Sequence, residues 1–343
     1  MQIQENISLK PYNTFGIDAR AKLFASFRDT EELVELLTTY SRLKTLTLGG
    51  GSNILFTKDY DGLVLKNEIK GINKLSEDED FVYIQAGAGE NWHQFVLQCI
   101  ENNWAGVENL SLIPGNVGAS PMQNIGAYGV EIKDVFHELK AFHVKEKTNY
   151  TFCLKDCGFG YRESVFKKKY KEEFIILDVT YKLRKQPVFN TSYGAIEQEL
   201  DRMEVKELSI KVISDAVINI RSSKLPNPTE IGNAGSFFKN PVVSIDKCQV
   251  IQSKFPSIIA YPSDDNNMKL AAGSLIEACD PDKIGTSWKG YRKGDAGCHS
   301  KQALVLVNYG NATGKEIYNL SEEILQAVKE KFGILLEREV NIF

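Results

Sequence analysis

Residues 113–129 read IPGNVGASPMQNIGAYG. The four glycines of this stretch permit backbone angles and close approaches that a Cβ atom would forbid, and Ser120, Gln123 and Asn124 supply neutral hydrogen-bonding groups. The segment is not an ordinary helix or strand, and its composition is that of a loop that holds a ligand. A glycine-rich loop that only turns a corner is the alternative, and a single loop of this kind would favour it.

A second glycine-rich run, LGGGSN at residues 48–53, follows a short expected strand. Two such loops in one chain indicate one large cofactor that carries phosphate groups. The chain has no Walker sequence, and the nearest dinucleotide fingerprint, GAGENW at residues 87–92, has Trp92 where the third glycine should pack. Consecutive glycines followed by Ser-Asn can instead direct several backbone N–H groups at a pyrophosphate without a lysine.

The composition restricts the classes of function. A chain of 343 residues predicts two or three domains. The formal net charge of −4, from 41 basic and 45 acidic residues, gives no basic footprint for nucleic acid. The sequence begins without signal-peptide features and contains no apolar window of membrane-spanning length, so we expect a cytoplasmic protein without a membrane partner. No coiled-coil seam is evident, and we expect a monomer.

The six cysteines are thinly spread and form no Cys-x-x-Cys pair, so we expect reduced thiols. Cys153 and Cys157, with His143 ten residues before Cys153, are the nearest approach to a metal site. They lack the usual ligand spacing, and no metal site is expected.

Short strands and helices alternate along the chain. Strands are expected at residues 22–27, 45–48, 62–65, 81–86 and 174–181. Helices are expected after Asp29, near Glu90 and from Ala195, and a capping box begins another at Thr313 that ends at Gly333. The aromatic residues at helical spacing after Glu90 are expected in the core, and the last ten residues are expected to form a strand.

Residues 49–53, 114–119 and 123–129 resemble the flavin-binding domain shared by vanillyl-alcohol oxidase and p-cresol methylhydroxylase. Together with NTFG at residues 13–16, GYRESVFK at residues 160–167 and GNAGSFFKNP at residues 232–241, they resemble the UDP-N-acetylenolpyruvoylglucosamine reductases of bacterial peptidoglycan synthesis. The motifs follow the family's order from residue 13 to residue 339. Chance could supply one glycine loop but not the whole series.

The resemblance implies an α+β fold with α/β elements: a flavin-binding fold of two subdomains followed by a C-terminal α+β substrate-binding domain. It divides the chain into residues 1–66 and 67–205 for the FAD subdomains, 206–325 for the substrate domain, and 326–343 for the end that carries a catalytic glutamate. It also implies noncovalent FAD, reduction by NADPH, and hydride transfer from flavin N5 to the enolpyruvyl ether of UDP-N-acetylglucosamine enolpyruvate, giving UDP-N-acetylmuramate.

The resemblance also assigns residues to the cofactor. The FAD-binding residues that it implies are Gly49, Gly50, Gly51, Ser52, Asn53, Pro114, Gly115, Gly118, Ala119, Gln123, Asn124, Gly126, Ala127 and Tyr128.

Three residues are expected to carry the catalysis, because the resemblance assigns them these roles. Arg162 would hold the substrate carboxylate through two hydrogen bonds, more strongly in the enolate-like transition state than in the substrate. Ser236 would donate the proton, and Glu339 would be its acidic partner. Glu337 is the alternative to Glu339, since both would point to the same face of a strand; the family places its glutamate directly before valine, as in Glu339-Val340.

Substrate binding is expected at Tyr193, Lys224, Asn240 and Gln302. The tyrosine loop at residues 192–194 indicates the longer of the family's two types. Residues 280–297, which are rich in aromatic and basic side chains, are a candidate contribution to the nucleotide pocket. Two other hypotheses are an oxidase of the same flavin superfamily, which would release hydrogen peroxide, and a flavin-carrying or nucleotide-sugar-binding protein without turnover.

Overall fold

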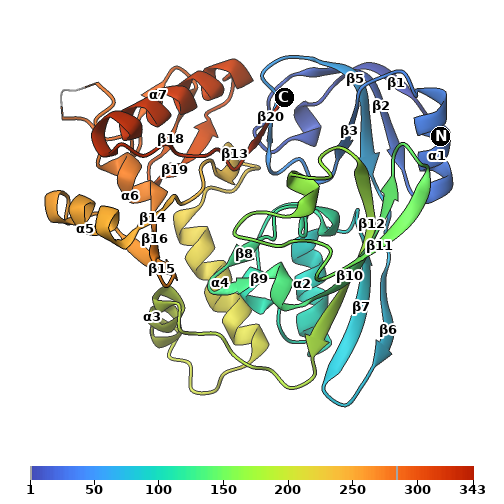
Figure 1. Cartoon of the computed structure of the whole chain (residues 1–343), viewed down its shortest axis with the longest axis horizontal. Coiled ribbons are helices and arrows are strands. Elements are labelled where there is room, and N and C mark those ends of the chain that lie inside the picture. The colour runs from blue at the N-terminus through green and yellow to red at the C-terminus, as the bar shows by residue number, and fades with distance from the viewer. Residues whose placement is uncertain (1, 283–284) are drawn as a thin grey trace. The chain divides into compact units, whose positions relative to one another are not determined.

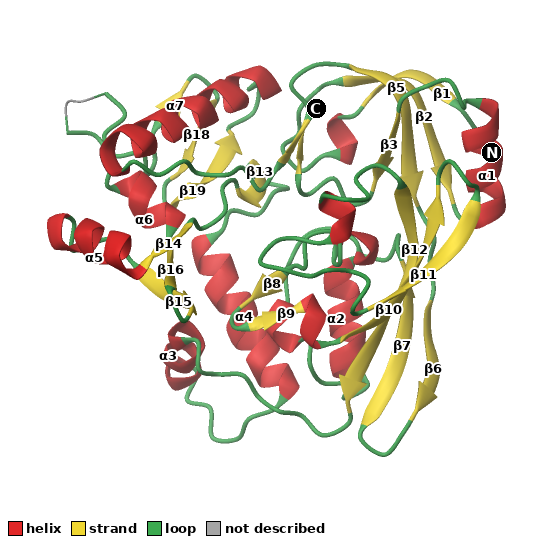
Figure 2. Cartoon of the chain, in the orientation of Figure 1, coloured by secondary structure: helices red, strands yellow, loops and turns green. Residues whose placement is uncertain are grey.

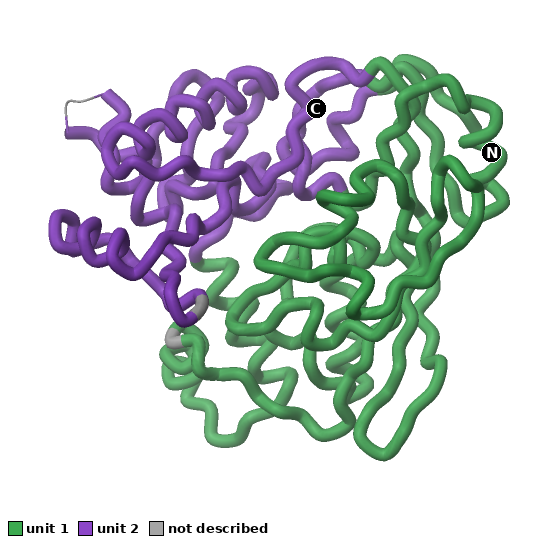
Figure 3. The backbone as a smooth tube through the Cα atoms, in the orientation of Figure 1, with its two compact units in different colours: residues 1–7, 21–50, 61–223 green, residues 8–20, 51–60, 224–343 purple. Residues whose placement is uncertain are grey.

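The computed structural model describes residues 2–282 and 285–343. The chain forms two compact units, each assembled from separate segments (Figures 1 and 3). Unit 1 comprises Met1–Ile7, Ala21–Gly50 and Asp61–Ser223, and unit 2 comprises Ser8–Arg20, Gly51–Tyr60 and Lys224–Phe343. This division differs from the four predicted segments, because residues 8–20 and 51–60 belong with the C-terminal part of the chain. The four-segment division stays a prediction.

The first sheet of unit 1 has the strand order β1-β2-β5-β3. Its strands are β1 (Gln4–Ser8), β2 (Arg20–Phe27), β5 (Tyr60–Asn67) and β3 (Thr45–Leu48). Strands β3 and β5 run parallel, with Leu48 opposite Lys66, so their carboxyl ends lie at the same edge. Helix α1 (Thr30–Thr39) connects β2 to β3 and begins where the Asp29 side chain accepts a hydrogen bond from the backbone N–H of Glu32.

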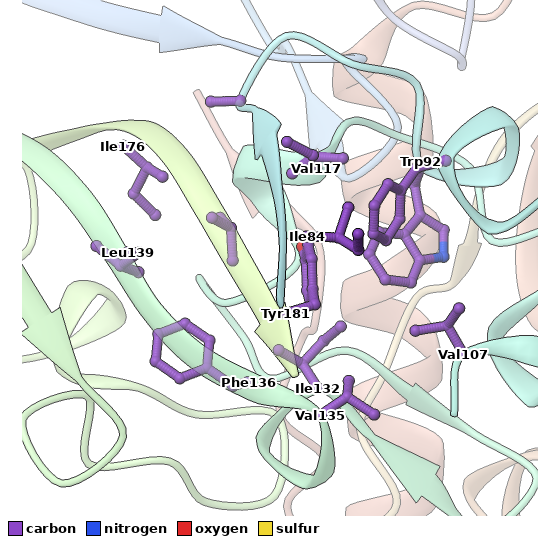
Figure 4. Close-up of a cluster of buried hydrophobic side chains, with 14 of the residues drawn as sticks. Ile84, Trp92, Val107, Val117, Ile132, Val135, Phe136, Leu139, Ile176 and Tyr181 are labelled. Carbon is purple, nitrogen blue, oxygen red and sulfur yellow. The ribbon is translucent and has the colours of Figure 1, made fainter. Parts of the chain in front are cut away.

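The second sheet of unit 1 has the order β11-β10-β12-β7-β6, with antiparallel neighbours throughout. Its strands are β11 (Thr148–Cys153), β10 (Phe136–His143), β12 (Phe174–Arg184), β7 (Phe81–Gly87) and β6 (Ile72–Glu77). Helix α2 (Trp92–Glu101) packs on this sheet through buried Trp92 and Phe95, whose rings both contact Tyr181. Trp92 and Tyr181 are shown in Figure 4. The prediction that these aromatic residues belong to the core is confirmed.

Shorter elements complete unit 1. They are β8 (Gly126–Ala127), β9 (Val130–Glu131), α3 (Gly194–Arg202) and α4 (Ile210–Lys224). Helices α3 and α4 pack together through buried Ile196, Ile213 and Val217. Single turns of 3-10 helix occupy Glu108–Leu110, Val117–Ala119, Ile132–Asp134 and Val165–Lys167, and a further one, Lys10–Tyr12, belongs to unit 2.

Unit 2 contains two antiparallel sheets and a pair of parallel strands. The larger sheet is β13 (Gly232–Ser236), β19 (Gln302–Asn308), β18 (Ala296–His299) and β17 (Arg292–Lys293), and the smaller is β14 (Val242–Ser244), β16 (Asn267–Leu270) and β15 (Ala260–Asp264). Strand β20 (Asn341–Ile342) pairs with β4 (Ile54–Leu55). The helices are α5 (Ile245–Lys254), α6 (Ala272–Glu277) and α7 (Gly314–Phe332).

The C-terminal region confirms one expectation and corrects another. Helix α7 has the predicted capping box between Thr313 and Glu316, and it ends at Gly333, which has a φ of 62°. The last ten residues, however, do not form one continuous strand. Only Asn341–Ile342 is regular strand, while Arg338 makes an isolated bridge to Phe238. Residues 337–339 face residues 237–239, and this short connection after β13 offers only a few backbone partners.

Helices and strands are mixed in both units, which agrees with the predicted α+β class (Figure 2). Among the described residues, no helix is both long and apolar enough to cross a membrane.

Candidate active site

The two predicted cofactor loops approach each other closely in unit 1. A Cβ atom on Gly50 would lie 2.8 Å from the Cα atom of Gly115 and 2.9 Å from the Asn116 side chain. Gly118 is equally restricted, since its Cβ would lie 2.6 Å from that of Ala88. Glycine is therefore required at both positions by close packing. A side chain at Gly50 would push the two loops apart, and one at Gly118 would clash with Ala88.

The next residue of the first loop belongs to unit 2. Gly51 has a φ of 62°, and a Cβ there would lie 2.0 Å from the backbone oxygen of Tyr12. Ser52 and Asn53 follow and are half-buried. The side chain of Asn53 donates a hydrogen bond of 3.2 Å to the backbone oxygen of Glu339. The cofactor loop thus contacts the segment that carries the predicted catalytic glutamate.

Three predicted site residues that are not glycine have left-handed backbones: Asn124 with a φ of 44°, Tyr128 with 51° and Arg162 with 56°. This conformation is uncommon outside glycine and is strained for bulky side chains. Such strain persists only where the surrounding structure enforces it, and it concentrates at ligand-binding and catalytic positions.

The predicted cofactor residues of the second loop differ in how far their side chains are buried. Asn124 is fully buried, and its amide donates to Glu131 at 2.9 Å and to the Gly160 oxygen at 3.1 Å while accepting from Lys133 N–H at 3.0 Å. Its side chain therefore orders the loop. By contrast Pro114 and Ala119 are exposed, and Gln123 and Ala127 are half-buried.

Arg162 is held against the cofactor loop. Its Nη2 donates a hydrogen bond of 2.6 Å to the backbone oxygen of Gly126, and a Cβ on Gly126 would lie 3.1 Å from Nη1. The guanidinium is half-buried and also lies over the Tyr161 ring, 5.5 Å from its centroid. A planar guanidinium has the geometry to bind a carboxylate through two parallel hydrogen bonds.

A second arginine, Arg221 on α4, lies in the same region and was not predicted. Its Nε donates to the backbone oxygen of Leu112 at 3.3 Å. Burial lowers the pKa of Arg221, the Tyr128 hydroxyl beside it opposes this shift, and the positive charge of Arg162 adds to it. Burial also raises the pKa of Tyr128. The sequence does contain a signal, because Arg221 follows Ile213 and Val217 at helical spacing on the buried face of α4.

The predicted lid residue Tyr193 contacts the cofactor loop. Its ring lies edge-on to that of Tyr128, with the centroids 5.5 Å apart, and it is 41% exposed. The loop at residues 192–194 therefore joins the second glycine-rich segment in unit 1.

Ser236 ends β13 at an irregularity in the strand. The pairing register of β13 with β19 shifts between Asn233 and Ser236. Gly235 has a φ of 69°, and its N–H donates to the Asn233 side chain at 2.9 Å. A bulge with a left-handed glycine redirects the following side chain, and bulges are frequent beside active sites. Ser236 is accordingly half-exposed, while Phe237 and Phe238 after it are buried.

The chain beyond Ser236 lies beside the terminal segment within unit 2. The N–H of Glu339 donates to the Phe237 oxygen at 2.9 Å, and the N–H of Lys239 donates to the Glu337 oxygen at 2.8 Å. In this register Glu339 lies beside Phe237, the residue that directly follows Ser236. Glu337 lies beside Lys239, which is two residues farther along the chain. The Glu337 carboxylate pairs at 2.6 Å with the amine of Lys239, whose side chain is only 7% exposed. The geometry therefore favours Glu339 over Glu337 as the partner of Ser236.

The predicted substrate residues of unit 2 include two that meet at the start of α6. The Asn240 side chain accepts a hydrogen bond of 2.9 Å from the Ala272 N–H, and the Gln302 side chain lies 2.7 Å from where a Cβ on Gly273 would be. Lys224 is exposed at the end of α4.

The small sheet next to Asn240 carries two polar side chains that were not predicted. Lys269 of β16 pairs with Val242 on one side and with Tyr261 on the other, so the three side chains form one row across the sheet. Tyr261 is partly exposed. A lysine beside a tyrosine suits a nucleotide diphosphate, but one lysine in a polar segment gives no distinctive sequence signal.

Two of the cavities in the described part of the chain bear on the predicted site. The larger of these two, about 990 Å³, lies between the residues after α6, Trp288 and α7. Its lining includes Asp280, Pro281 and Trp288 from the candidate nucleotide segment, residues 280–297. The smaller, about 420 Å³, is lined by Asn116 of the second cofactor loop and by side chains at the end of β5. The smaller of the two therefore adjoins the second cofactor loop.

Residues 280–297 were a candidate for the nucleotide pocket, and residues 283–284 lie outside the described residues. Trp288 is buried against Tyr291, with ring centroids 5.1 Å apart. Arg292 pairs with Asp295 at 2.7 Å, and Lys293 pairs with Glu323 at the same distance. These side chains hold the segment to its own unit, and the nucleotide role stays a prediction.

Comparison with known proteins identifies the family. Residues 227–343 match the family described as UDP-N-acetylenolpyruvoylglucosamine reductase, C-terminal domain, and residues 21–147 match the FAD binding domain. A Flavobacterium johnsoniae protein named UDP-N-acetylenolpyruvoylglucosamine reductase is 51% identical over 343 residues, covering 100% of both chains. One of the same name from Pseudomonas aeruginosa is 45% identical, covering 100% of this chain and 99% of its own.

The chain belongs to the UDP-N-acetylenolpyruvoylglucosamine reductase family. A crystal structure of such a reductase from Thermus caldophilus has a TM-score of 0.68 at 23% identity, covering 100% of this chain and 99% of its own, and it shows the same fold. The resemblance inferred from the motifs is thus confirmed over the whole chain.

The reductase family assignment does not itself test the individual site residues. All of the predicted cofactor-loop residues lie within the matched FAD binding domain. Ser236, Asn240, Gln302 and Glu339 lie within the matched C-terminal domain. Arg162, Tyr193 and Lys224 lie between the two matched regions.

Proposed function

We propose that this chain is a UDP-N-acetylmuramate dehydrogenase that uses NADPH and bound FAD to reduce the enolpyruvyl ether of UDP-N-acetylglucosamine enolpyruvate. The observation that carries the proposal is full-length identity to reductases of this name, in a chain whose β13 bulge exposes Ser236 beside the Glu339 segment. The product, UDP-N-acetylmuramate, is a precursor of peptidoglycan.

The residues of the two glycine loops fit FAD. The absence of a side chain at Gly50 brings the first loop against Gly115 of the second, and consecutive backbone N–H groups of such glycine loops can bind a pyrophosphate. The glycine loops would hold FAD, which would supply the chemistry of hydride transfer from NADPH to the terminal vinyl carbon of the substrate. The protein must then stabilise negative charge on the adjacent carbon and its carboxylate, and must deliver a proton there.

Arg162 stabilises that negative charge in this proposal. Its guanidinium is fixed at Gly126, and the planar arrangement of its donors matches a carboxylate. The charge on the carboxylate grows in the transition state, so the interaction lowers the barrier rather than only improving binding. Arg221 is a second cation of unit 1, near enough to Tyr128 and Arg162 for both to affect its pKa.

Ser236 donates the proton to the carbon next to the carboxylate. A serine hydroxyl is a weak acid, so this role requires a strongly basic carbanionic acceptor and a neighbouring group that stabilises the resulting alkoxide or promptly returns a proton to it. Glu339 is proposed to assist by polarising the substrate carboxylate or holding it in its enolic form. Its position beside Phe237 brings its backbone within one residue of Ser236.

The nucleotide part of the substrate is assigned to Tyr193, Lys224, Asn240 and Gln302, to which we add Tyr261 and Lys269. Lysines neutralise the diphosphate, the carboxamides form hydrogen bonds to sugar or base, and the tyrosines provide apolar faces. We further propose a cytoplasmic monomer that binds neither nucleic acid nor membrane. Size-exclusion chromatography with light scattering tests the monomer, for which a mass of 38.5 kDa is expected.

The proposal predicts a selective kinetic defect in Ser236→Ala. Reduction of the flavin by NADPH should stay close to wild type, while reoxidation by the enolpyruvyl substrate should slow by about 10²- to 10⁴-fold, the usual contribution of a positioned general acid. Anaerobic stopped-flow absorbance measures both half-reactions. Ser253→Ala, on the exposed surface of α5, is the matched control and should change neither rate. Unchanged reoxidation in Ser236→Ala would remove this residue from the mechanism.

A further inference from the structure

Residues 160–163 form a tight turn with Arg162 as its third residue. The N–H of Gly160 donates to the Glu163 oxygen at 3.0 Å, and the N–H of Glu163 donates to the Gly160 oxygen at 3.2 Å. A β-turn whose third residue is left-handed favours glycine at that position, yet Arg162 occupies it with a φ of 56°. The turn therefore depends on contacts with the rest of unit 1 to hold the arginine in this conformation.

Three hydrogen bonds from side chains to backbone oxygens join this turn, and the residue after it, to residues 122–126 of the second cofactor loop. They link Ser164 to Met122 at 2.6 Å, Asn124 to Gly160 at 3.1 Å, and Arg162 to Gly126 at 2.6 Å. Ser164 is 2% exposed and Asn124 is fully buried, so both of these side chains are shielded from water. The position of Arg162 is thus tied to that of the cofactor loop.

The Ser164 hydroxyl acts both as a donor and as an acceptor. Its Oγ donates to the Met122 oxygen and accepts a hydrogen bond of 3.2 Å from the N–H of Phe166. The second bond begins the single 3-10 turn at Val165–Lys167, in which Phe166 is buried against Phe152 with the ring centroids 4.9 Å apart. Aromatic packing therefore anchors the segment after Ser164 in the core, while the hydroxyl connects it to the cofactor loop.

We propose that Ser164 is a positioning residue for Arg162. Its bond to Met122 holds the turn at residues 160–163 against the second cofactor loop, and so keeps the guanidinium at the Gly126 oxygen. The inference rests on the proposed role of Arg162 in the reduction and identifies a residue on which that role depends. Displacement of a catalytic group by about 1 Å can slow a reaction by about 100-fold, so a bond remote from the chemistry can control its rate.

The test measures both half-reactions of full-length Ser164→Ala by anaerobic stopped-flow absorbance. Reoxidation of the flavin by UDP-N-acetylglucosamine enolpyruvate should slow by about 10- to 100-fold, because the guanidinium that binds the substrate carboxylate is no longer fixed. Reduction of the flavin by NADPH should stay close to wild type. Ser164→Cys, which keeps a side chain of similar size but is a weak donor, should show the same selective defect and decides the test where the alanine variant does not fold.

A double-mutant cycle shows whether Ser164 acts through Arg162. Arg162→Ala should slow reoxidation on its own. Adding Ser164→Ala to it should cause no further slowing, because no guanidinium remains to be positioned. A general structural effect would instead multiply the two losses, as expected for independent sites.

Ser214→Ala is the matched control. Ser214 is 1% exposed on α4, and its hydroxyl shares a hydrogen bond of 2.7 Å with that of Ser111. The midpoint of urea unfolding should shift to a similar extent in Ser214→Ala and Ser164→Ala, since each variant loses a buried hydrogen bond. Only Ser164→Ala should show slow reoxidation.

Three results would overturn the inference. Normal reoxidation in the folded Ser164 variants, with slow reoxidation in Arg162→Ala, would show that Arg162 keeps its place without this bond, and the proposed function would stand. Equal slowing of both half-reactions, or multiplied losses in the double variant, would assign Ser164 to general stability. Normal reoxidation in Arg162→Ala would contradict the proposed role of Arg162 itself, and this inference would fail with it.

Discussion

Two glutamates near the C-terminus, Glu337 and Glu339, differ in their surroundings although they are two residues apart. Glu337 is engaged by the buried amine of Lys239 at 2.6 Å, and its own side chain is 65% exposed. Glu339 is half-buried and lies beside Phe237, the residue after Ser236. A carboxylate committed to an ion pair on the exposed side of the segment is poorly placed to act on a substrate.

We therefore expect opposite phenotypes for the two conservative substitutions. Glu339→Gln should slow reoxidation of the flavin by the enolpyruvyl substrate by at least about 100-fold, because the charge that acts on the substrate is removed. Glu337→Gln should leave reoxidation within about threefold and lower the free energy of unfolding by about 1 kcal/mol, as for loss of a partly exposed ion pair. Stopped-flow absorbance and urea unfolding measure the two effects. Slow reoxidation in Glu337→Gln together with normal reoxidation in Glu339→Gln would show that Glu337, and not Glu339, is the catalytic glutamate.

At this scale the sequence predicted the residues that lie in motifs, and it missed those defined by packing. Ser236 and Arg162 lie in recognisable sequence motifs. In the structure Ser236 follows a β-bulge, and Arg162 donates a hydrogen bond to the Gly126 oxygen. The ion pair of Glu337 joins positions 98 apart in sequence numbering (337 − 239) and has no local signature. Arg221 was visible only as a cation on an otherwise apolar helix face.

Among the elements, the end of β13 combines a left-handed glycine, Gly235, with the proposed proton donor, Ser236. Gly235 has a φ of 69°, and nothing lies within 4 Å of where its Cβ would be. A substitution there would therefore act through the backbone alone. A bulge at this position redirects the following Ser236, so the conformation of one glycine sets the direction of the proposed proton donor.

Gly235→Ala is expected to lower the free energy of unfolding by about 1–2 kcal/mol, because an L-residue is disfavoured at this φ. It should also slow flavin reoxidation by about tenfold or more by misdirecting Ser236. Gly294→Ala is the matched control, since Gly294 has a φ of 62° and equally open surroundings in the turn between β17 and β18. It should show the same loss of stability in urea unfolding with normal reoxidation. If both variants reoxidised the flavin at the same rate, the bulge would have no specific role in catalysis.

Elements with strong local signals were predicted well. Helix α7 has its capping box and its terminal glycine, and strands β3 and β7 occur where apolar runs indicated them. The terminal strand was predicted too long. Buried and exposed residues do alternate from Ile334 to Glu337, but alternation shows which side of a segment is buried and not whether a continuous partner strand exists.

On the scale of the whole molecule, the family was predictable because its motifs occur in a fixed order along the chain. The compact units were not, because unit 2 includes residues 8–20 and 51–60 through long-range contacts. The Asn308 side chain donates to the Phe15 oxygen at 2.9 Å, and β20 pairs with β4. Pairings across nearly the full length of the chain leave no local trace in the sequence.

The most direct test of the reductase activity follows the flavin absorbance of the intact protein without oxygen. The purified protein should carry FAD, and NADPH should bleach its absorbance. UDP-N-acetylglucosamine enolpyruvate, added next, should restore the absorbance with formation of UDP-N-acetylmuramate, and no other acceptor should be required. A bound flavin that NADPH cannot reduce, or a reduced flavin that reoxidises only with oxygen and releases hydrogen peroxide, would contradict the assignment.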